Sequence, residues 1–270
     1  MQALWKDIRH ALRMFRVNPG LTAVAVLSLA IGIGPNAAVF SLIDGLGFRP
    51  LPIRDPASLL LVSSAAPKVR SGEASYAEYV EIRDRVPAFS TVAAAATQGV
   101  SIAGGTQGPS LGFAGQVSAS YFETLGVAPV VGRTFLSGED QTPGTHPVAI
   151  ITERLWVKRY GRDPQILGRT IRLNRVDCAI VGVMPAAFRG TTPPYGPDVW
   201  VPLVQSSSLW TAPASVTDPR DARRLTLFAR LGPQATLSQA QAAVDALAAH
   251  LAQAYPDTNR DRRFTIAYEE

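Results

Sequence analysis

The sequence has a single cysteine, Cys178, and only three histidines among its 270 residues. One cysteine excludes an intramolecular disulfide, and its apolar, strand-like neighbours (CAIVGV) favour a buried small side chain over a reactive thiol. His10 precedes a long apolar run, and His250 falls on the polar side of an expected helix. His146 is the remaining candidate, but no cysteine or second histidine stands near it to share a metal ion. We interpret His146 as a turn residue.

Motifs of common enzyme classes are also missing. The sequence contains neither a nucleotide-binding P-loop (G-x-x-x-x-G-K-[ST]) nor the G-x-S-x-G elbow of serine hydrolases. The stretch GTQGPS at 105–110 has no lysine and is interpreted as a loop. The acidic pairs Glu139-Asp140 and Glu269-Glu270 are adjacent in sequence, which is typical of a solvated turn or a terminus. We therefore assign no catalytic, cofactor-binding or metal-binding residue, and we expect no enzyme.

Two groups of side chains have a structural and a functional interpretation. Three arginines close to Asp163 are interpreted as partners in surface ion pairs: Arg159, Arg162 and Arg169. Three aromatic residues would suit a binding groove, although the WVPL context of the second favours core packing: Tyr195, Trp200 and Trp210.

The excess of basic residues is concentrated at the N-terminus. The formal net charge is +5, but the first 16 residues carry four basic side chains against one acidic, which leaves about +2 for the rest. Lysine is scarce, with Lys6, Lys68 and Lys158 among 26 basic residues, and an arginine bias of this kind is more typical of genomic base composition than of phosphate contacts. The basic pI therefore does not indicate a nucleic-acid partner.

The longest uncharged apolar segment runs from Val17 to Ile43. Its core, Leu21 to Ile43, would be about 35 Å long as a helix, enough to cross a hydrocarbon layer of about 30 Å. A cleavable signal peptide has a shorter apolar core of about 7 to 15 residues, although the small residues after Asn36 leave processing as an alternative. The sequence thus predicts a transmembrane helix at 19–45 in contact with the lipid bilayer.

The flanks of this segment predict its orientation. Four basic residues precede it and only Arg49 and Arg54 follow closely, so the N-terminus is expected in the cytoplasm and the remainder outside, at the inner (plasma) membrane. Residues 1–18 resemble an amphipathic basic helix at the cytoplasmic interface, with an ordinary basic flank as the alternative. Pro35 and its neighbouring glycines interrupt the span in a way that favours packing against a partner helix.

The remainder of the chain predicts an α+β domain with mixed sheets. Capping boxes mark three helix starts, at Ser75, Ser120 and Thr236, and the last opens an amphipathic helix over 236–255. A further helix is expected from Glu153 to Tyr160. Nine short β-rich runs lie between them: LLLVSS, TVAAAA, FAGQVSA, PVAIIT, TIRLN, CAIVGVM, DVWVPL, RLTLFARL and RFTIAY. A domain boundary is expected near 105–110, and the chain is expected to return to the first part near 205–222. The domain would then consist of two lobes.

Several phrases, in order from about residue 3 to 260, resemble the N-terminal portion of MacB-like ABC transporter permeases, in particular the large orphan permeases of the ADOP type. They include RHALRMFRVNPGLTAVAVLSLAIGIGPNAAVFSLID, SYAEYVEIRDR, VSASYFETLGVAPVVGRTF, PVAIITERLWVKRYGRDPQILGRTIRLN, IVGVMPAAFRG, DVWVPL and AQAAVDALAAHLAQAYPDTN. The resemblance implies a first transmembrane helix followed by a periplasmic core domain over 46–270, with a porter-like part and an inserted lobe at roughly 108–215.

The same resemblance implies a permease subunit that takes part in export or efflux. Its expected partners are a separate ABC ATPase subunit, a second permease copy and a membrane-fusion protein, and its periplasmic domain would couple ATP-driven motion without catalysis. The family continues into further transmembrane helices, so the end at Glu270 suggests a fragment, a truncated product or a degenerate paralogue. The alternatives are a membrane-anchored exported enzyme using His146 or acidic chemistry, and a single-span binding or structural protein.

Overall fold

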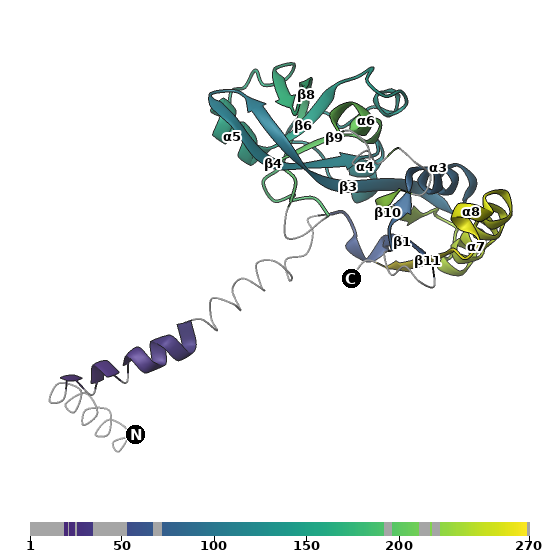
Figure 1. Ribbon diagram of the computed structural model, residues 1–270, viewed down its shortest axis with the longest axis horizontal. Coiled ribbons are helices and arrows are strands. Elements are labelled where there is room, and N and C mark those ends of the chain that lie inside the picture. The colour runs from purple at the N-terminus through teal and green to yellow at the C-terminus, as the bar shows by residue number, and fades with distance from the viewer. Residues whose placement is uncertain are drawn as a thin grey trace. The chain divides into compact units, whose positions relative to one another are not determined.

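A computed structural model describes most of the chain beyond residue 52 and part of the apolar segment (Figure 1). The described residues are 19–20, 22–24, 26–34, 53–66, 72–191, 196–210, 217 and 222–268. The chain divides into two compact units, Met1–Pro50 and Leu51–Glu270.

In the first unit, the described residues between 19 and 34 are helical. Their large apolar side chains are exposed: Val24, Val26, Leu27, Leu29, Ile31 and Ile33. Within the portion of the chain that the structure describes, no helix has the length and apolar character needed to cross a membrane. The remainder of the predicted span, at 21, 25 and 35–45, and the predicted cytoplasmic segment 1–18 lie outside the described residues. The membrane topology therefore stays a prediction.

The second unit contains eleven described strands that join into one mixed sheet. The strands are β1 (Leu59–Ala65), β2 (Ala74–Ser75), β3 (Phe89–Gly104), β4 (Gln107–Val117), β5 (Val131–Gly132), β6 (Val148–Thr152), β7 (Thr170–Leu173), β8 (Val176–Met184), β9 (Val199–Pro202), β10 (Arg223–Leu231) and β11 (Arg263–Tyr268). The main path of the sheet is β11-β1-β10-β3-β4-β9-β6-β8-β5. The α+β class with a mixed sheet is thus confirmed.

Short helices cover the faces of this sheet (Figure 1). They are α3 (Tyr76–Arg85), α4 (Tyr121–Leu125), α5 (Glu153–Tyr160), α6 (Ser206–Leu209), α7 (Leu237–Ala254) and α8 (Pro256–Asn259), with 3-10 turns η1 (Pro56–Ser58), η2 (Ser137–Asp140) and η3 (Leu203–Gln205). Helices α3, α7 and α8 lie beside β10, β1 and β11, whereas α5 lies at the other end of the sheet, near β4, β6 and β8.

Six strands close into a ring at that end of the sheet. Strand β3 pairs with β4, β4 with β9, β9 with β6, β6 with β8, β8 with β7, and β7 returns to β3. Only the β4–β9 and β6–β8 pairs are parallel. A closed ring leaves few unpaired main-chain groups, so any gap in its wall is a place where another chain can pair.

Strand β3 contributes side chains both to the ring and to the helical end of the domain. Ala94 belongs to the apolar cluster under α3 and α7, and Val100 and Ile102 belong to the cluster under α5. Ala93 and Ala95 face the other way, into a third cluster with the aromatic side chains of α4. One strand of 16 residues therefore contributes to all three apolar clusters, because it is long and its successive side chains point to opposite faces.

Most local predictions agree with this fold. Helix α5 and strand β11 have the predicted bounds, and the capping boxes Ser75 with Glu78 and Thr236 with Gln239 are present. The box at Ser120 is wrong, because the hydroxyl donates to a main-chain carbonyl of β3 at 2.6 Å and makes no cap. The predicted boundaries of the two lobes are tested by none of these observations and stay a prediction.

The predicted loop at 105–110 is also only partly correct. Gly105 has a φ of 70° and lies in a tight turn, but strand β4 already begins at Gln107. A Cβ atom at Gly105 would stand 2.2 Å from the carbonyl oxygen of Arg159, so the turn needs glycine to approach α5. The Gly and Pro residues that suggested a loop instead build a hairpin held against that helix.

Candidate functional site

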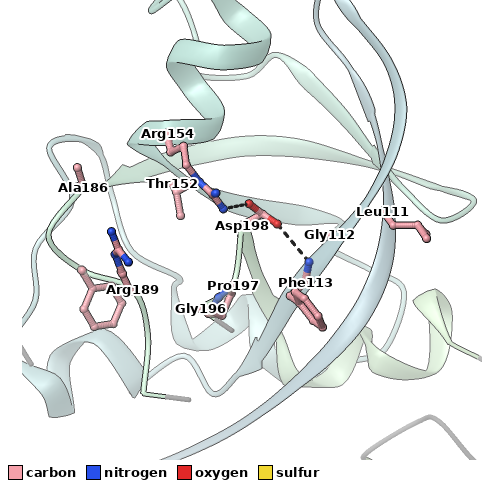
Figure 2. Close-up of a pocket in the computed structure, with 11 residues that line it drawn as sticks. Leu111, Gly112, Phe113, Thr152, Arg154, Ala186, Arg189, Gly196, Pro197 and Asp198 are labelled. Atoms are coloured by element: carbon pink, nitrogen blue, oxygen red, sulfur yellow. Dashed lines mark hydrogen bonds and ion pairs between the residues drawn. The ribbon is translucent and has the colours of Figure 1, made fainter. Parts of the chain in front are cut away.

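A cavity with a volume of about 490 Å³ opens beside strand β4. Leu111, Gly112 and Phe113 of β4 form one wall, and Thr152 and Arg154 at the start of α5 stand opposite (Figure 2). The 196–198 segment that leads into β9 lies between them. This size is within the range of small-ligand pockets, about 300 to 1,000 Å³.

Asp198 organises the centre of this cavity. One carboxylate oxygen accepts a hydrogen bond from the Phe113 N–H at 3.2 Å, and the other is paired with the guanidinium of Arg154 (Figure 2). A Cβ atom at Gly112 would lie 2.6 Å from the Asp198 carboxylate, so only glycine lets the carboxylate approach the strand. Asp198, the residue directly before β9, is thereby held against the edge of β4.

A second, smaller cavity of about 170 Å³ adjoins the first and shares Leu111, Arg154 and Asp198 with it. Its wall includes Lys158 and Arg159 of α5. The two cavities therefore lie along one stretch of the β4 edge, with cationic side chains on the side of α5.

Arg159 has a different position from the one predicted. The sequence suggested a surface ion pair, but the residue is only 1% exposed and its guanidinium donates to carbonyls of the β3–β4 hairpin and to the Ser110 hydroxyl. The Ser110 contact is 2.7 Å and the contact with the Ile102 carbonyl is 3.0 Å. Arg159 thus fastens the hairpin to α5 and does not face a ligand.

The other two arginines of that group behave as predicted on the surface, with one change of partner. Arg169 pairs with Asp163, whereas Arg162 pairs with Glu153 at 2.9 Å. The hydrogen bond from the Gln165 N–H and the neighbouring Arg169 guanidinium lower the pKa of the Asp163 carboxyl.

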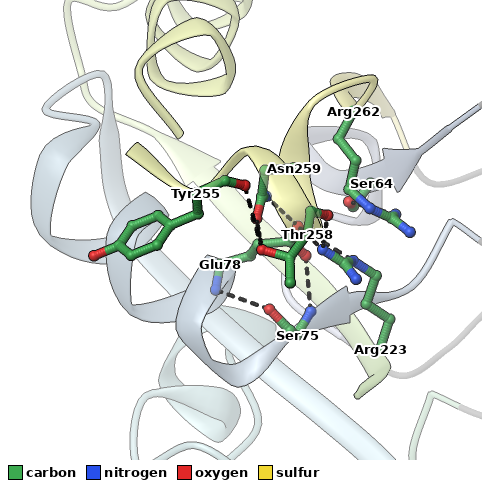
Figure 3. Close-up of polar contacts among 8 residues, drawn as sticks. All are labelled: Ser64, Ser75, Glu78, Arg223, Tyr255, Thr258, Asn259 and Arg262. Atoms are coloured by element: carbon green, nitrogen blue, oxygen red, sulfur yellow. Dashed lines mark hydrogen bonds and ion pairs between the residues drawn. The ribbon is translucent and has the colours of Figure 1, made fainter. Parts of the chain in front are cut away.

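A second polar cluster lies at the other end of the domain, around Glu78 (Figure 3). Glu78 is fully buried, and its Oε1 accepts from Arg223 at 3.0 Å and from the Asn259 amide at 2.9 Å. Its Oε2 accepts from the Ser75 N–H at 2.9 Å as part of the capping box. The Arg223 side chain is only 9% exposed and also donates to the Thr258 carbonyl. This cluster joins α3, β10 and α8.

The acidic pair at η2 is not a solvated turn, which corrects the prediction. Glu139 is 7% exposed and forms a two-pronged ion pair with Arg133 at 2.7 and 2.9 Å. Burial opposes the charged form of Glu139, but hydrogen bonds from Arg133 and from the Leu136 N–H outweigh it, so the pKa is lowered. The other predicted acidic pair, Glu269-Glu270, lies outside the described residues.

Asp140 differs from its neighbour because it has no cation within hydrogen-bonding distance among the described residues. Burial raises its pKa to about 6, against the opposing hydrogen bonds from the N–H groups of Val204 and Ala119. These two bonds connect the loop before α4 to the turn after β9. The charge of Asp140 therefore depends on pH near neutrality.

The remaining sequence candidates have structural positions. His146 lies in an exposed turn, where its Nδ1 is 2.8 Å from the Thr145 hydroxyl. Cys178 is buried, as predicted, and burial raises the pKa of its thiol to about 12. Trp200 and Trp210 are core residues, and Tyr195 lies outside the described residues. In the part of the chain that the structure describes, no group of three or more His, Cys, Asp and Glu side chains is placed to hold a metal ion.

Comparison with known proteins gives the context for this geometry. The profile of the MacB-like periplasmic core domain matches residues 22–247. The periplasmic region of MacB from Actinobacillus actinomycetemcomitans is similar, with a TM-score of 0.56 and 12% identity over 84% of this chain and 91% of that chain.

Two further solved structures have the same fold. A domain of a candidate permease from Porphyromonas gingivalis has a TM-score of 0.57 and 12% identity over 81% of this chain and 93% of that chain. The extracellular domain of the noncanonic ABC-type transporter YknZ from Gram-positive bacteria has a TM-score of 0.55 and 11% identity over 77% and 99%. No curated protein matches the sequence. The family profile covers most of the chain and the solved structures share its fold, so this chain belongs to the family of MacB-like periplasmic core domains of ABC transporter permeases.

Proposed function

We infer that the chain is the N-terminal part of a permease subunit in an ABC transporter, and that its large domain transmits ATP-driven motion to the exported substrate path without catalysing a reaction. The observation that carries this inference is the family match over residues 22–247, which includes both the apolar segment and the α+β domain. The absence of a P-loop from the sequence assigns ATP hydrolysis to another subunit.

The architecture of the domain suits mechanical transmission. Strand β3 runs from the cluster under α3 and α7 into the six-stranded ring, and β10 pairs with its first half. Packed cores and continuous ladders resist deformation, so displacement at one end of such a sheet is passed on to the other end. The buried Glu78–Arg223 pair adds a rigid joint between α3 and β10.

The proposed topology follows the sequence pattern. Residues 1–18 form a cytoplasmic basic segment, residues 19–45 a span in the inner membrane, and residues 46–270 the domain on the outer side. In this arrangement, the exposed apolar side chains of the helical residues between 19 and 34 face lipid or a partner helix. The proposed partners are a separate ABC ATPase, a second permease copy and a membrane-fusion protein.

Co-purification tests the proposed partners. The tagged full chain is extracted from membranes of the producing cell in mild detergent, and the co-eluting proteins are identified by mass spectrometry. We expect an ABC ATPase or a second permease copy at near-equal amounts. A monomer that elutes without either protein, in two detergents and in nanodiscs, would contradict the inference.

Accessible cysteines test the topology separately. Because Cys178 is buried and its thiol pKa is raised to about 12, the native chain should react little with a membrane-impermeant maleimide. His10→Cys and Ser208→Cys each place one thiol on a predicted side of the membrane, and Ser208 is exposed in the structure. We expect labelling of Ser208→Cys when the reagent reaches only the outer face of the inner membrane. Labelling of His10→Cys should require lysis of that membrane, and the reverse pattern would contradict the topology.

A further inference from the structure

The cavity beside β4 occupies a gap in the wall of the strand ring. Strand β9 pairs with β4 only over Ala114–Val117 and with β6 only at Ile150 and Ile151. Asp198, the residue before Val199, still bonds to both neighbours, because its N–H donates to the Phe113 carbonyl at 2.8 Å and its carbonyl accepts from the Thr152 N–H at 3.0 Å. The cavity of about 490 Å³ lies next to it, between β4 and the start of α5 (Figure 2). The gap therefore lies beside the part of β4 that β9 does not pair with.

At Leu111, β4 faces this gap, and no strand of the described chain pairs with it on that side. The Phe113 N–H and carbonyl bond to Asp198 on this side, at 3.2 and 2.8 Å. Strand alternation turns the N–H and carbonyl of Leu111 the same way. Its side chain is 90% exposed. Pro109 offers a carbonyl only, which keeps the open edge short and limits aggregation.

The charges around the gap favour an acidic occupant. Arg154 is matched by Asp198, but Arg189 on the far wall and Lys158 on the next turn of α5 form no ion pair with another described residue. Both are exposed. The gap therefore presents two uncompensated cations on either side of one strand edge, and an occupant with carboxylates complements them.

We propose that this gap is a docking site for an extended acidic peptide segment of a partner protein. The segment adds a short strand to β4 through the N–H and carbonyl of Leu111 and places carboxylates near Lys158 and Arg189. A small organic anion would satisfy the cations but leave the Leu111 main-chain groups unpaired. The edge and the charges together therefore select an extended peptide.

Selection from a random heptapeptide display library tests the proposal on the full chain in nanodiscs. We expect enrichment of sequences that combine Asp or Glu with β-prone residues, measured against the Leu111→Pro variant as counter-selection. The Leu111 N–H faces outward, so proline removes a docking donor without breaking a ladder bond in the sheet. Leu111→Ala keeps the N–H group and separates the main-chain contribution from that of the side chain.

The selected peptide is then synthesised with a fluorescent label and its affinity is measured by anisotropy. We expect Leu111→Pro to weaken binding about five- to tenfold and Leu111→Ala to change it by less than about threefold. Lys158→Glu combined with Arg189→Glu should weaken it by about tenfold or more at about 50 mM salt, and by less at about 500 mM salt. Far-UV circular dichroism and the urea midpoint of each variant show that the fold is retained.

Four results would overturn the proposal. The first is a selection that enriches no acidic sequence over the counter-selected variant. The second is equal binding by Leu111→Pro. The third is displacement of the peptide by glutarate alone at comparable concentration, which would assign the gap to a small anion. The fourth is self-association of the chain that is lost in Leu111→Pro, which would assign the gap to a second copy.

Discussion

Replacement of Glu78 by glutamine is expected to destabilise the domain strongly, although it changes one atom. Glutamine keeps a carbonyl oxygen for Arg223 and Asn259 but removes the charge that neutralises a guanidinium only 9% exposed. The glutamine amide also turns an N–H donor toward the Ser75 N–H. In the wild type that Ser75 N–H donates a hydrogen bond of 2.9 Å to the Glu78 carboxylate. Breaking a buried ion pair by removing one partner costs about 3 to 5 kcal/mol. Because a typical domain is stable by about 5 to 15 kcal/mol, this loss is a large fraction of the total.

Urea unfolding of the full chain in detergent, followed by far-UV circular dichroism, measures this loss. Asp84→Asn on the same helix is the matched control, because it removes a carboxylate from an ion pair with Arg83 whose side chains are 42% and 52% exposed. We expect the control to cost about 0 to 1 kcal/mol. The double variant Glu78→Gln with Arg223→Met should cost less than the sum of its single variants by about 2 kcal/mol, because no unpaired buried charge remains.

Three further predictions concern other buried or partly buried polar groups. Burial raises the pKa of Asp140 to about 6 from 3.8, so the stability contributed by its protonated form is fully present below about pH 4 and is lost as the pH rises through 6. Between pH 4.5 and 7.5 the free energy of unfolding from urea melts should therefore fall by about 2 kcal/mol relative to Asp140→Asn, and a constant difference would contradict this. Arg159→Met should lower the free energy of unfolding by about 3 kcal/mol and speed amide hydrogen exchange in the β3–β4 hairpin, measured by mass spectrometry. Unchanged exchange in the hairpin would refute the conclusion that Arg159 fastens it to α5. The Gln241 side chain bonds to the main chain of Phe264 and Ile266 on the outer edge of β11. Gln241→Ala should therefore cost about 1 to 2 kcal/mol of stability and increase aggregation, measured by light scattering. A variant that is equally stable and equally soluble would show that other groups protect this edge.

The parts of the fold that could be read from the sequence depend on neighbours a few residues apart. The capping box at Ser75 needs a carboxylate three positions later, and the buried stripe of α7 repeats every three or four residues. Short β-rich runs likewise located most of the strands, although β2 and β5 are too short to give such a signal. Such patterns can be recognised in the sequence because the interacting groups belong to the same helix or strand.

The polar clusters could not be read in this way, because their members are distant in the sequence. Glu78 meets partners 145 and 181 positions away, and Arg159 bonds to a residue 57 positions before it. Arg159 stands among other charged residues in the chain, so its neighbours indicated a solvated surface. A single sequence gives no signal that a hairpin far upstream will fold over that side chain. The gap beside β4 is hidden for the same reason, because Asp198 and Phe113 are 85 positions apart.

These long-range contacts have a common consequence for a domain that transmits motion. Three buried or partly buried ionisable groups are fixed by residues from two or three elements: Glu78 joins α3, β10 and α8, Arg159 joins α5 to the β3–β4 hairpin, and Asp140 joins the loop before α4 to η3. Apolar packing tolerates small sliding, but a buried charge that loses its partners is costly, so these joints resist relative movement of the elements they connect. The gap beside β4 is different, since the Asp198 side chain accepts from a single N–H of the strand edge, pairs with the exposed Arg154 and is itself 17% exposed. Within the described domain, the rigid joints therefore favour movement as a unit, and the open edge of the ring is where a partner can attach to that unit.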